Sequence, residues 1–194
     1  MSDTNCSNDS TNYSGESRRS SIKPNDILID NISSTLESLI EENKHLLNYN
    51  EKIIAQKKLL FNAKELPTIT IKNYLYRIQT YSEAEDNTLI FALILIDKIC
   101  ETGSIILTEY NIHRLLFISI LISIKYNEDL VFELDCYSKI AGISKKEIKK
   151  LEYEFLTLIK FEVYVQKTLF DNYKNYIYNI NSLKDNIDDE DIFY

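Results

Sequence analysis

The sequence predicts an all-α protein, and three observations carry that prediction. Only 3 of the 194 residues are glycine and 2 are proline, far below the usual ~7% and ~5%. β-Hairpins and sandwiches need such turn residues, so their scarcity favours helices joined by short loops. Apolar residues recur at intervals of three and four along most of the chain, which is the spacing of an amphipathic helix. Hydrophobic residues make up 44% of the chain, enough to bury a sizeable core.

The first helical segments lie on the N-terminal side. Apolar residues at helical spacing predict a helix over roughly Asp26–Leu47 and a second amphipathic piece around Glu51–Phe61. Pro67 then interrupts the chain, and Thr68 or Thr70 can cap the helix that follows. The apolar face of that helix contains Ile71, Tyr74, Leu75 and Ile78.

The middle of the chain is predicted to form the centre of the bundle. Asp86 or Asn87 can cap a helix that Gly103 ends. The next helix is expected over about Thr108–Tyr126, and within it residues 112–122 are apolar nearly all round. A helix that is hydrophobic on every side belongs in the interior of a bundle.

Three further helices are expected toward the C-terminus. A short one over Leu134–Ala141 should stop at Gly142. Ser144–Glu147 has the form of a capping box and opens a helix to about Lys160. The last helix is expected over Thr168–Tyr178.

Both ends of the chain are predicted to be tails outside the folded domain. Residues 1–23 are rich in serine and asparagine and almost devoid of large apolar groups, so we expect them to be disordered. Residues 181–194 carry five acids against one lysine, and we expect a solvated acidic extension.

Charge and composition argue against several classes of function. The net charge of −8 and the pI near 4.9 disfavour nucleic-acid binding and binding to anionic membranes, which both need a basic surface. The three cysteines are widely spaced and the two histidines lie far apart, so we expect no disulfide framework, metal or cofactor. No signal peptide or apolar segment of membrane-spanning length is present, and we expect a soluble cytoplasmic or nuclear protein.

The most informative residues are charges that lie on apolar helical faces. Glu152 falls on the face formed by Ile148, Leu151 and Phe155, and Lys125 lies among apolar residues near the end of the central helix. A charge in such a position needs a partner, although a lysine can also extend its ammonium group to water. Apolar residues border both charges, and a charge pair ringed by apolar groups is typical of a protein-binding hot spot.

A second pair of charges invites a structural interpretation. Asp97 lies between Leu93 and Ile90 on its helix, and Arg77 flanks the apolar face of an earlier one. We expect Arg77 and Asp97 to form an ion pair that holds the two helices together.

Taken together, several strings of the sequence resemble the cyclin box, and more narrowly the phosphate-pathway branch, the P-type or U-type cyclins. The matching strings are Pro67–Ile78, Leu89–Lys98, Asn111–Leu116, Ser123–Tyr126, Ala141–Ser144, Leu151–Leu156 and Phe161–Val163. They span roughly Leu60–Tyr178, and their order and spacing are more specific than any one of them.

The resemblance implies a five-helix cyclin box around a buried central helix, with an added N-terminal and a C-terminal helix. It divides the chain into the tail 1–23, an N-terminal extension 24–62, a single cyclin box 63–180 and the acidic tail 181–194. In cyclins a lysine and a glutamate hold the regulatory helix of a cyclin-dependent kinase. The residues that match the kinase-binding positions are Ile122, Lys125, Tyr126, Glu152, Leu156 and Phe161. Arg77 and Asp97 match a structural ion pair inside the box.

The resemblance also implies a function. It implies a regulatory subunit without catalytic activity that forms a heterodimer with the kinase and favours the inward position of its regulatory helix. Cell-cycle cyclins bind substrates in a surface groove that carries a characteristic sequence string. Leu75–Ile78 stands in place of that string here, which argues against substrate docking of that kind.

Two alternatives remain open from the sequence. The first is a cyclin-fold scaffold or adaptor that activates no kinase. The second is an enzyme in which His113 pairs with Cys100 or Cys136 as base and nucleophile. A packed or hydrogen-bonded His113 is the simpler interpretation.

Overall fold

The computed structural model describes residues 23–45 and 60–188, with the side chains of residues 181–188 left undescribed. Seven helices and no strand occur in this part of the chain. The helices are α1 (Asp26–Lys44), α3 (Ile71–Ser82), α4 (Asp86–Glu101), α5 (Ile112–Asn127), α6 (Leu134–Ala141), α7 (Lys145–Leu158) and α8 (Lys167–Asp188). The predicted all-α class is confirmed.

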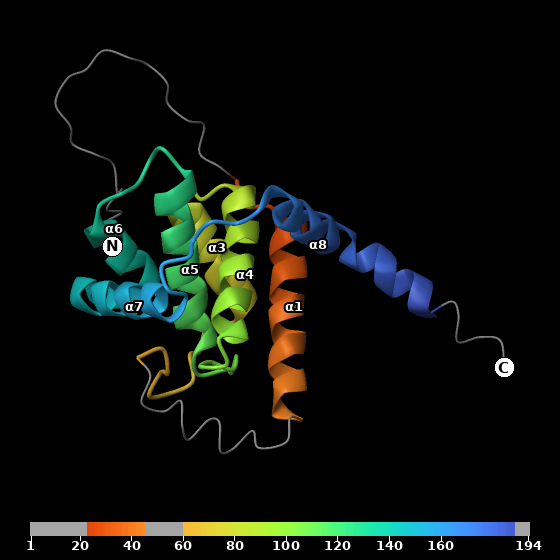
Figure 1. Ribbon diagram of the computed structural model, residues 1–194, viewed down its shortest axis with the longest axis horizontal. Coiled ribbons are helices and arrows are strands. Elements are labelled where there is room, and N and C mark those ends of the chain that lie inside the picture. Colours follow the sequence, from red (N-terminus) through yellow and green to blue (C-terminus); the bar gives the residue numbers. More distant parts are fainter. Residues whose placement is uncertain (1–22, 46–59, 189–194) are drawn as a thin grey trace, which may run out of the picture.

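The centre of the bundle is α5, as the apolar sequence predicts. Every residue from Leu115 to Ile124 is buried. The side chains of Ser119 and Ser123 are among them, and each donates its hydroxyl proton to a carbonyl of its own helix, at 2.9 Å and 2.7 Å. Helix α5 packs against α3, α4 and α7, so a buried helix is surrounded by the amphipathic ones (Figure 1).

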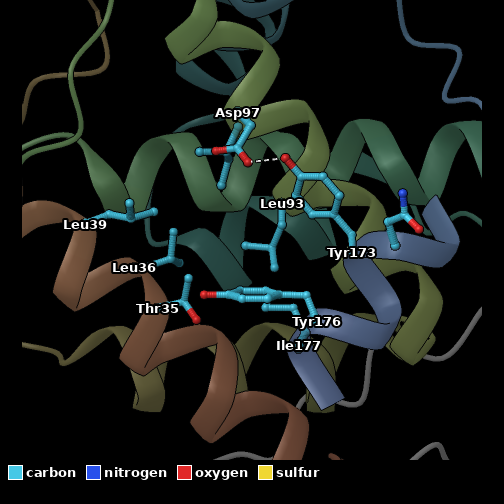
Figure 2. Close-up of a pocket in the computed structure, with 10 residues that line it drawn as sticks. Thr35, Leu36, Leu39, Leu93, Asp97, Tyr173, Tyr176 and Ile177 are labelled. Atoms are coloured by element: carbon cyan, nitrogen blue, oxygen red, sulfur yellow. Dashed lines mark hydrogen bonds between the residues drawn. The ribbon is translucent and has the colours of Figure 1, made fainter. Parts of the chain in front are cut away.

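The last helix closes the bundle on the opposite side from α7. Helix α8 crosses the first helix and α4, and its C-terminal part projects away from the other helices (Figure 1). Ile177 of α8 is 1% exposed, and its carbonyl accepts a hydrogen bond from Asn31 Nδ2 of α1 at 2.8 Å. The hydroxyl group of Tyr173 in α8 donates a hydrogen bond to the Asp97 carboxylate of α4 (Figure 2).

That contact corrects the predicted ion pair between Arg77 and Asp97, because each residue has a different partner. Arg77 Nη2 donates a hydrogen bond to the carbonyl of Lys139 in α6 at 2.8 Å, whereas Asp97 faces α8. A helical wheel places a charge on a face of its own helix, but it does not tell which neighbouring helix covers that face.

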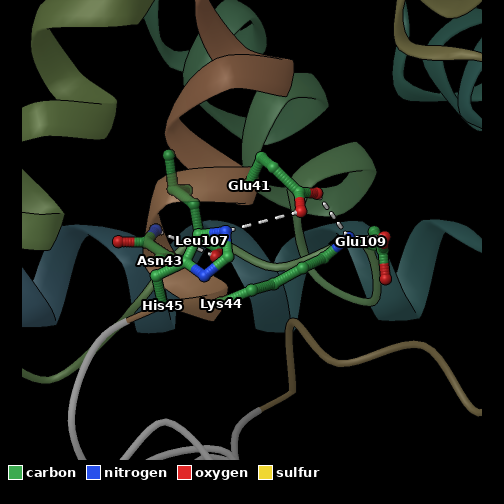
Figure 3. A network of polar contacts seen from close by, with 6 residues as sticks. All are labelled: Glu41, Asn43, Lys44, His45, Leu107 and Glu109. Carbon is green, nitrogen blue, oxygen red and sulfur yellow. Dashed lines mark hydrogen bonds and ion pairs between the residues drawn. The ribbon is translucent and has the colours of Figure 1, made fainter.

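The C-terminal end of α1 is held by a polar network (Figure 3). Lys44 Nζ lies 2.8 Å from a carboxylate oxygen of Glu41 and 2.7 Å from one of Glu109, in the turn before α5. These hydrogen bonds raise the pKa of Lys44. Asn43 Nδ2 also donates to the carbonyl of Leu107 at 3.1 Å, so the end of α1 is tied to the loop that precedes the central helix.

The N-terminal end of α1 is held by a buried glutamine. Gln79 of α3 is fully buried. Its Nε2 donates to Asp86 Oδ1 at 2.9 Å, and its Oε1 accepts from the backbone amide of Asn25 at 3.3 Å. Asn25 Nδ2 donates to Asp86 Oδ2 at 2.7 Å. The three side chains join α1, α3 and α4, and every polar group named here has a partner.

Two of the predicted local caps are confirmed and one is wrong. Thr70 accepts a hydrogen bond from the amide of Asn73 at 3.2 Å, and Ser144 accepts one from Glu147 at the same distance. Neither Asp86 nor Asn87 caps α4: the N-cap position is Glu85, which makes no side-chain cap bond.

A side chain that is distant in sequence fixes the start of α4 instead. Oε1 of Glu128, just beyond the end of α5, accepts from the amide of Glu85 at 3.0 Å and from the hydroxyl group of Thr88 at 2.6 Å. The start of α4 is therefore fixed by the end of its neighbour.

Other boundaries differ from expectation by a few residues. Helix α5 begins at Ile112, after a turn in which the Thr108 carbonyl accepts from the amide of Ile112 at 3.0 Å. Helix α8 runs to Asp188, ten residues beyond the predicted end and into the predicted acidic tail. The predicted tail 1–23 lies almost entirely outside the described residues, as does most of the piece predicted around Glu51–Phe61.

Candidate functional site

The charges that the sequence places on apolar faces of two helices meet in the structure. Lys125 lies in the last turn of α5 and Glu152 in the second half of α7. Lys125 Nζ and Glu152 Oε1 are 2.6 Å apart. The lysine side chain is 38% exposed and the glutamate side chain 18%, so the pair lies at the surface with the carboxylate set deeper.

An exposed aromatic residue adjoins the lysine of this ion pair in sequence. Tyr126 follows Lys125 and is 52% exposed. Its ring stacks on the ring of Phe91 in α4, with centroids 5.6 Å apart and planes 26° from parallel. Phe91 itself is only 7% exposed. A rigid buried ring therefore supports an exposed one, a role for Phe91 that nothing in its sequence position signals.

A second exposed aromatic, Phe161, follows the end of α7. It is 60% exposed. Both Lys160 (φ 54°) and Phe161 (φ 60°) have left-handed backbone conformations. The amide of Phe161 donates to the carbonyl of Leu156 at 2.7 Å, and that of Lys160 to Thr157 at 3.0 Å. This is a Schellman ending, in which a lysine occupies the left-handed position that glycine usually takes.

Lys98 of α4 holds the loop that follows. Its ammonium group donates to the carbonyl of Glu162 at 3.1 Å and to that of Tyr164 at 2.6 Å. These two bonds fix the backbone on the C-terminal side of Phe161. Tyr164, which is 69% exposed, is a further exposed aromatic residue of this loop that sequence reasoning missed.

The remaining predicted residues have different degrees of exposure. Leu156 is partly buried on α7 and packs against the core. Ile122 is 4% exposed, so it supports the site from below rather than presenting a contact area of its own. We call the set of Lys125, Tyr126, Glu152, Leu156 and Phe161 the docking surface.

His113 and Cys100, the hypothetical base and one hypothetical nucleophile, lie in surroundings that do not favour catalysis. His113 Nε2 lies 2.8 Å from the carbonyl of Ile69, and its ring packs against that of Tyr74 with centroids 5.2 Å apart. Burial lowers the pKa of His113. Burial, with Asp97 and Glu101 nearby, raises the pKa of the Cys100 thiol to about 12, which opposes thiolate formation. These placements give no support to the enzyme hypothesis.

No group of three or more His, Cys, Asp or Glu among the described residues is placed to hold a metal ion. None of the helices in residues 23–45 and 60–188 combines the length and hydropathy of a membrane span.

The partly exposed ion pair and the exposed aromatic residues are typical of proteins that dock on other proteins. They lie on or just beyond the same two helices, α5 and α7, and have the composition of a protein-docking hot spot. A surface of this composition is suited to binding another protein.

Comparison with known proteins gives the family. The cyclin family model matches residues 5–163. The chain is 35% identical to Cyclin-U2-2 of Arabidopsis thaliana over 152 residues, and 33% identical to Cyclin-U4-1 of the same plant over 151 residues. The chain belongs to the cyclin family, and its relatives lie in the U-type and P-type branch that the sequence resembles.

The similarity also extends to a yeast protein. The chain is 28% identical to PHO85 cyclin-7 of Saccharomyces cerevisiae over 174 residues, which are 80% of this chain and 61% of the yeast protein. The match to Cyclin-U2-2 covers 73% of this chain and 65% of the plant protein, and that to Cyclin-U4-1 covers 77% and 74%. The chain thus spans just under two thirds of the length of Cyclin-U2-2.

Proposed function

We propose that this cyclin is a regulatory subunit that binds a cyclin-dependent protein kinase through the docking surface and activates it. The observation that carries the proposal is the 2.6 Å ion pair between Lys125 and Glu152, together with two exposed rings. Tyr126 is next to Lys125 in sequence, and Phe161 lies just beyond the end of α7. The name of the yeast relative, a PHO85 cyclin, supports a partner of this kind. The protein would act without catalysis of its own, in the cytoplasm, the nucleus or both.

The mechanism follows from the physics of kinases. The catalytic lysine of a protein kinase pairs with a glutamate on the kinase's mobile regulatory helix, and the pair forms only when that helix lies inward. A docking surface that binds the inward position better shifts the kinase population toward it. Lys125 and Glu152 would exchange part of their mutual contact for hydrogen bonds to backbone groups of the kinase, while Tyr126 and Phe161 bury their apolar surface.

The size of the population shift sets how much more tightly the active state must be bound. Moving a kinase from one active molecule in a hundred to ninety-nine in a hundred requires about 10⁴-fold tighter binding to the active state. A few well-packed residues can account for a difference of this size, because truncating one hot-spot side chain costs about 2 kcal/mol or more of binding free energy.

The test is affinity capture from extracts of the protein's own cells, with the recovered proteins identified by mass spectrometry and assayed for kinase activity. The full chain is compared with Glu152→Lys and with the exchange variant Lys125→Glu/Glu152→Lys. The exchange variant keeps an internal ion pair of reversed direction, so it separates docking from folding. The matched control is Lys145→Ala/Asp135→Ala, which removes an exposed ion pair of 2.8 Å that includes the first residue of α7.

We expect an active cyclin-dependent kinase with the wild type and the control, and none with either docking variant. Equal recovery of the kinase with all four proteins would mean that it binds elsewhere. Recovery of other proteins without a kinase, or of a kinase that stays inactive, would favour the alternative, a scaffold or adaptor of the cyclin fold.

A further inference from the structure

A cavity of about 410 Å³ lies between α1, α4 and α8. Its volume is within the ~300–1,000 Å³ typical of small-molecule sites. The walls are mainly aliphatic: Leu36 and Leu39 come from α1, Leu93 and Ile96 from α4, and Ile177 from α8. Figure 2 shows Leu36, Leu39, Leu93 and Ile177 around the opening between the three helices. None of the residues of the docking surface lines this cavity.

Two tyrosines of α8 give the cavity an aromatic character. Tyr176 is 52% exposed, and its ring lies across the cavity toward Thr35 of α1 (Figure 2). Tyr173, one turn earlier, lines the same space. The faces of tyrosine rings attract cations, and they do so most where water is excluded.

One carboxylate lies at the end of this aromatic and aliphatic space. Asp97 lines the cavity and accepts the hydroxyl hydrogen bond of Tyr173. Its burial raises the pKa of the carboxyl group, and the negative charge of Glu101 in the next turn adds to the effect.

No cation balances this charge within the described structure. Arg77, the partner expected from the sequence, donates to Lys139 instead. Lys98, the neighbouring residue, is engaged by two backbone carbonyls. Asp97 therefore places a carboxyl group without a counter-ion at an apolar cavity, where burial disfavours its charged form and a cationic ligand would stabilise that form.

We propose that the cavity between α1, α4 and α8 binds a small organic ammonium compound. The ammonium group is held by the Asp97 carboxylate and lies against the tyrosine rings, while the apolar body of the ligand fills the space between Leu36, Leu39 and Leu93. A neutral ligand would gain only the apolar burial, and an anion would be repelled by Asp97. The proposal is independent of kinase docking.

The test uses three probes of nearly equal shape: 2-phenylethylammonium, 2-phenylethanol and phenylacetate. Each is titrated into the full chain and followed by heteronuclear NMR, which reports both the affinity and the residues affected. We expect the ammonium probe to bind at least about tenfold more tightly than the alcohol, because a charge-assisted hydrogen bond is stronger than a neutral one. Phenylacetate should bind more weakly than either.

Three variants locate the effect. Asp97→Asn should bring the affinity of the ammonium probe to that of the alcohol and leave the alcohol unchanged. Leu39→Trp should fill the space and abolish binding of both. Glu101→Gln is the control, since Glu101 does not line the cavity, and the preference for the ammonium probe should survive in it.

Several results would overturn the proposal. They are equal affinities of the ammonium and alcohol probes for the wild type, absence of binding at about 10 mM ammonium probe, or an undiminished preference in Asp97→Asn. If Asp97→Asn fails to fold, the ranking of the three probes on the wild type and the shifts in α1, α4 and α8 decide the question without it.

Discussion

The ion pair of Lys125 and Glu152 is too exposed to contribute much to folding. Pairs of this exposure stabilise proteins by about 0–1 kcal/mol, since both charges remain partly hydrated. Removing the pair should therefore change the free energy of unfolding very little. This is what makes the exchange variant informative: a loss of binding in it would be a property of the surface and not of the fold.

Phe161 offers a sharper separation of stability from binding. Its left-handed backbone conformation costs a non-glycine residue roughly 1–2 kcal/mol, and its side chain is mostly exposed. Phe161→Gly should raise the free energy of unfolding by up to about 1 kcal/mol and at the same time weaken kinase recovery. Chemical unfolding and affinity capture measure the two effects.

The neighbouring residue supplies the matched control. Lys160 has a similar left-handed conformation but is not part of the docking surface. Lys160→Gly should give the same stabilisation and leave kinase recovery unchanged. If both variants weakened recovery equally, the conformation of this turn, and not the phenyl ring, would be what the partner requires.

Asp97 should make stability depend on pH in an unusual direction. Burial raises its pKa in the folded protein above the unfolded value of about 3.9. The folded state then binds more protons between the two pKa values. The stability that Asp97 contributes is complete below the unfolded pKa and is lost as pH rises through the folded pKa.

Asp97→Asn removes this dependence and keeps an oxygen that can accept from Tyr173. We expect the variant to gain stability relative to wild type as pH rises from about 4, and the difference to level off above the folded pKa. Urea unfolding at a series of pH values measures it. A difference that stays constant with pH would show that Asp97 has the same pKa in both states.

At the scale of the helix, α4 begins where α5 ends. Glu128 accepts hydrogen bonds from the amide of Glu85 and the hydroxyl group of Thr88, so it caps a helix from which it is some forty residues distant in sequence. Glu128→Ala should lower the free energy of unfolding by about 1–2 kcal/mol, the usual effect of losing a cap. Thermal unfolding measures the change.

The control for the cap is Asp129→Ala, which removes the exposed neighbouring acid and should have little effect. Equal destabilisation by both variants would mean that the net charge of this loop matters and the cap does not.

The caps also show why some elements could be predicted from the sequence and others could not. Thr70 and Ser144 cap their helices through residues three positions away, so the signal is local. The cap of α4 depends on a distant glutamate that pattern analysis cannot connect with it. The sequence predicts the end of α8 near Tyr178, and the residues that follow are rich in asparagine and aspartate, which are weak helix formers. No glycine or proline interrupts them before Asp188.

The same distinction applies to the two sites. Helical periodicity places Lys125 and Glu152 on apolar faces, and the family resemblance connects them, as the structure does. Periodicity also places Asp97 on a buried face, but the covering element is α8, which lies some seventy residues away. The resemblance implies Arg77 as the partner of Asp97. Packing between distant helices decides which residue Asp97 contacts, and that packing has no local signal in the sequence.

At the scale of the molecule, α4 is the element that the two proposed sites share. Asp97 faces the cavity beside α8, whereas Lys98 faces the loop of Phe161 and Tyr164. Ile94, Leu95 and Ile96 are all at most 1% exposed, so the helix is fixed in the core between the sites. A well-packed helix transmits an effect only if it has two arrangements.

We therefore expect the two sites to act independently. Asp97→Asn should leave kinase recovery unchanged, and Glu152→Lys should leave the affinity for 2-phenylethylammonium unchanged. In the double variant the changes in the free energy of unfolding should add to within about 0.5 kcal/mol, as they do for sites without shared partners. Kinase recovery that changes when the ammonium probe is bound would contradict this. Because coupling between two ligands is reciprocal, the kinase would then alter the affinity for the probe by the same factor, and α4 would be the first element in which to look for a second arrangement.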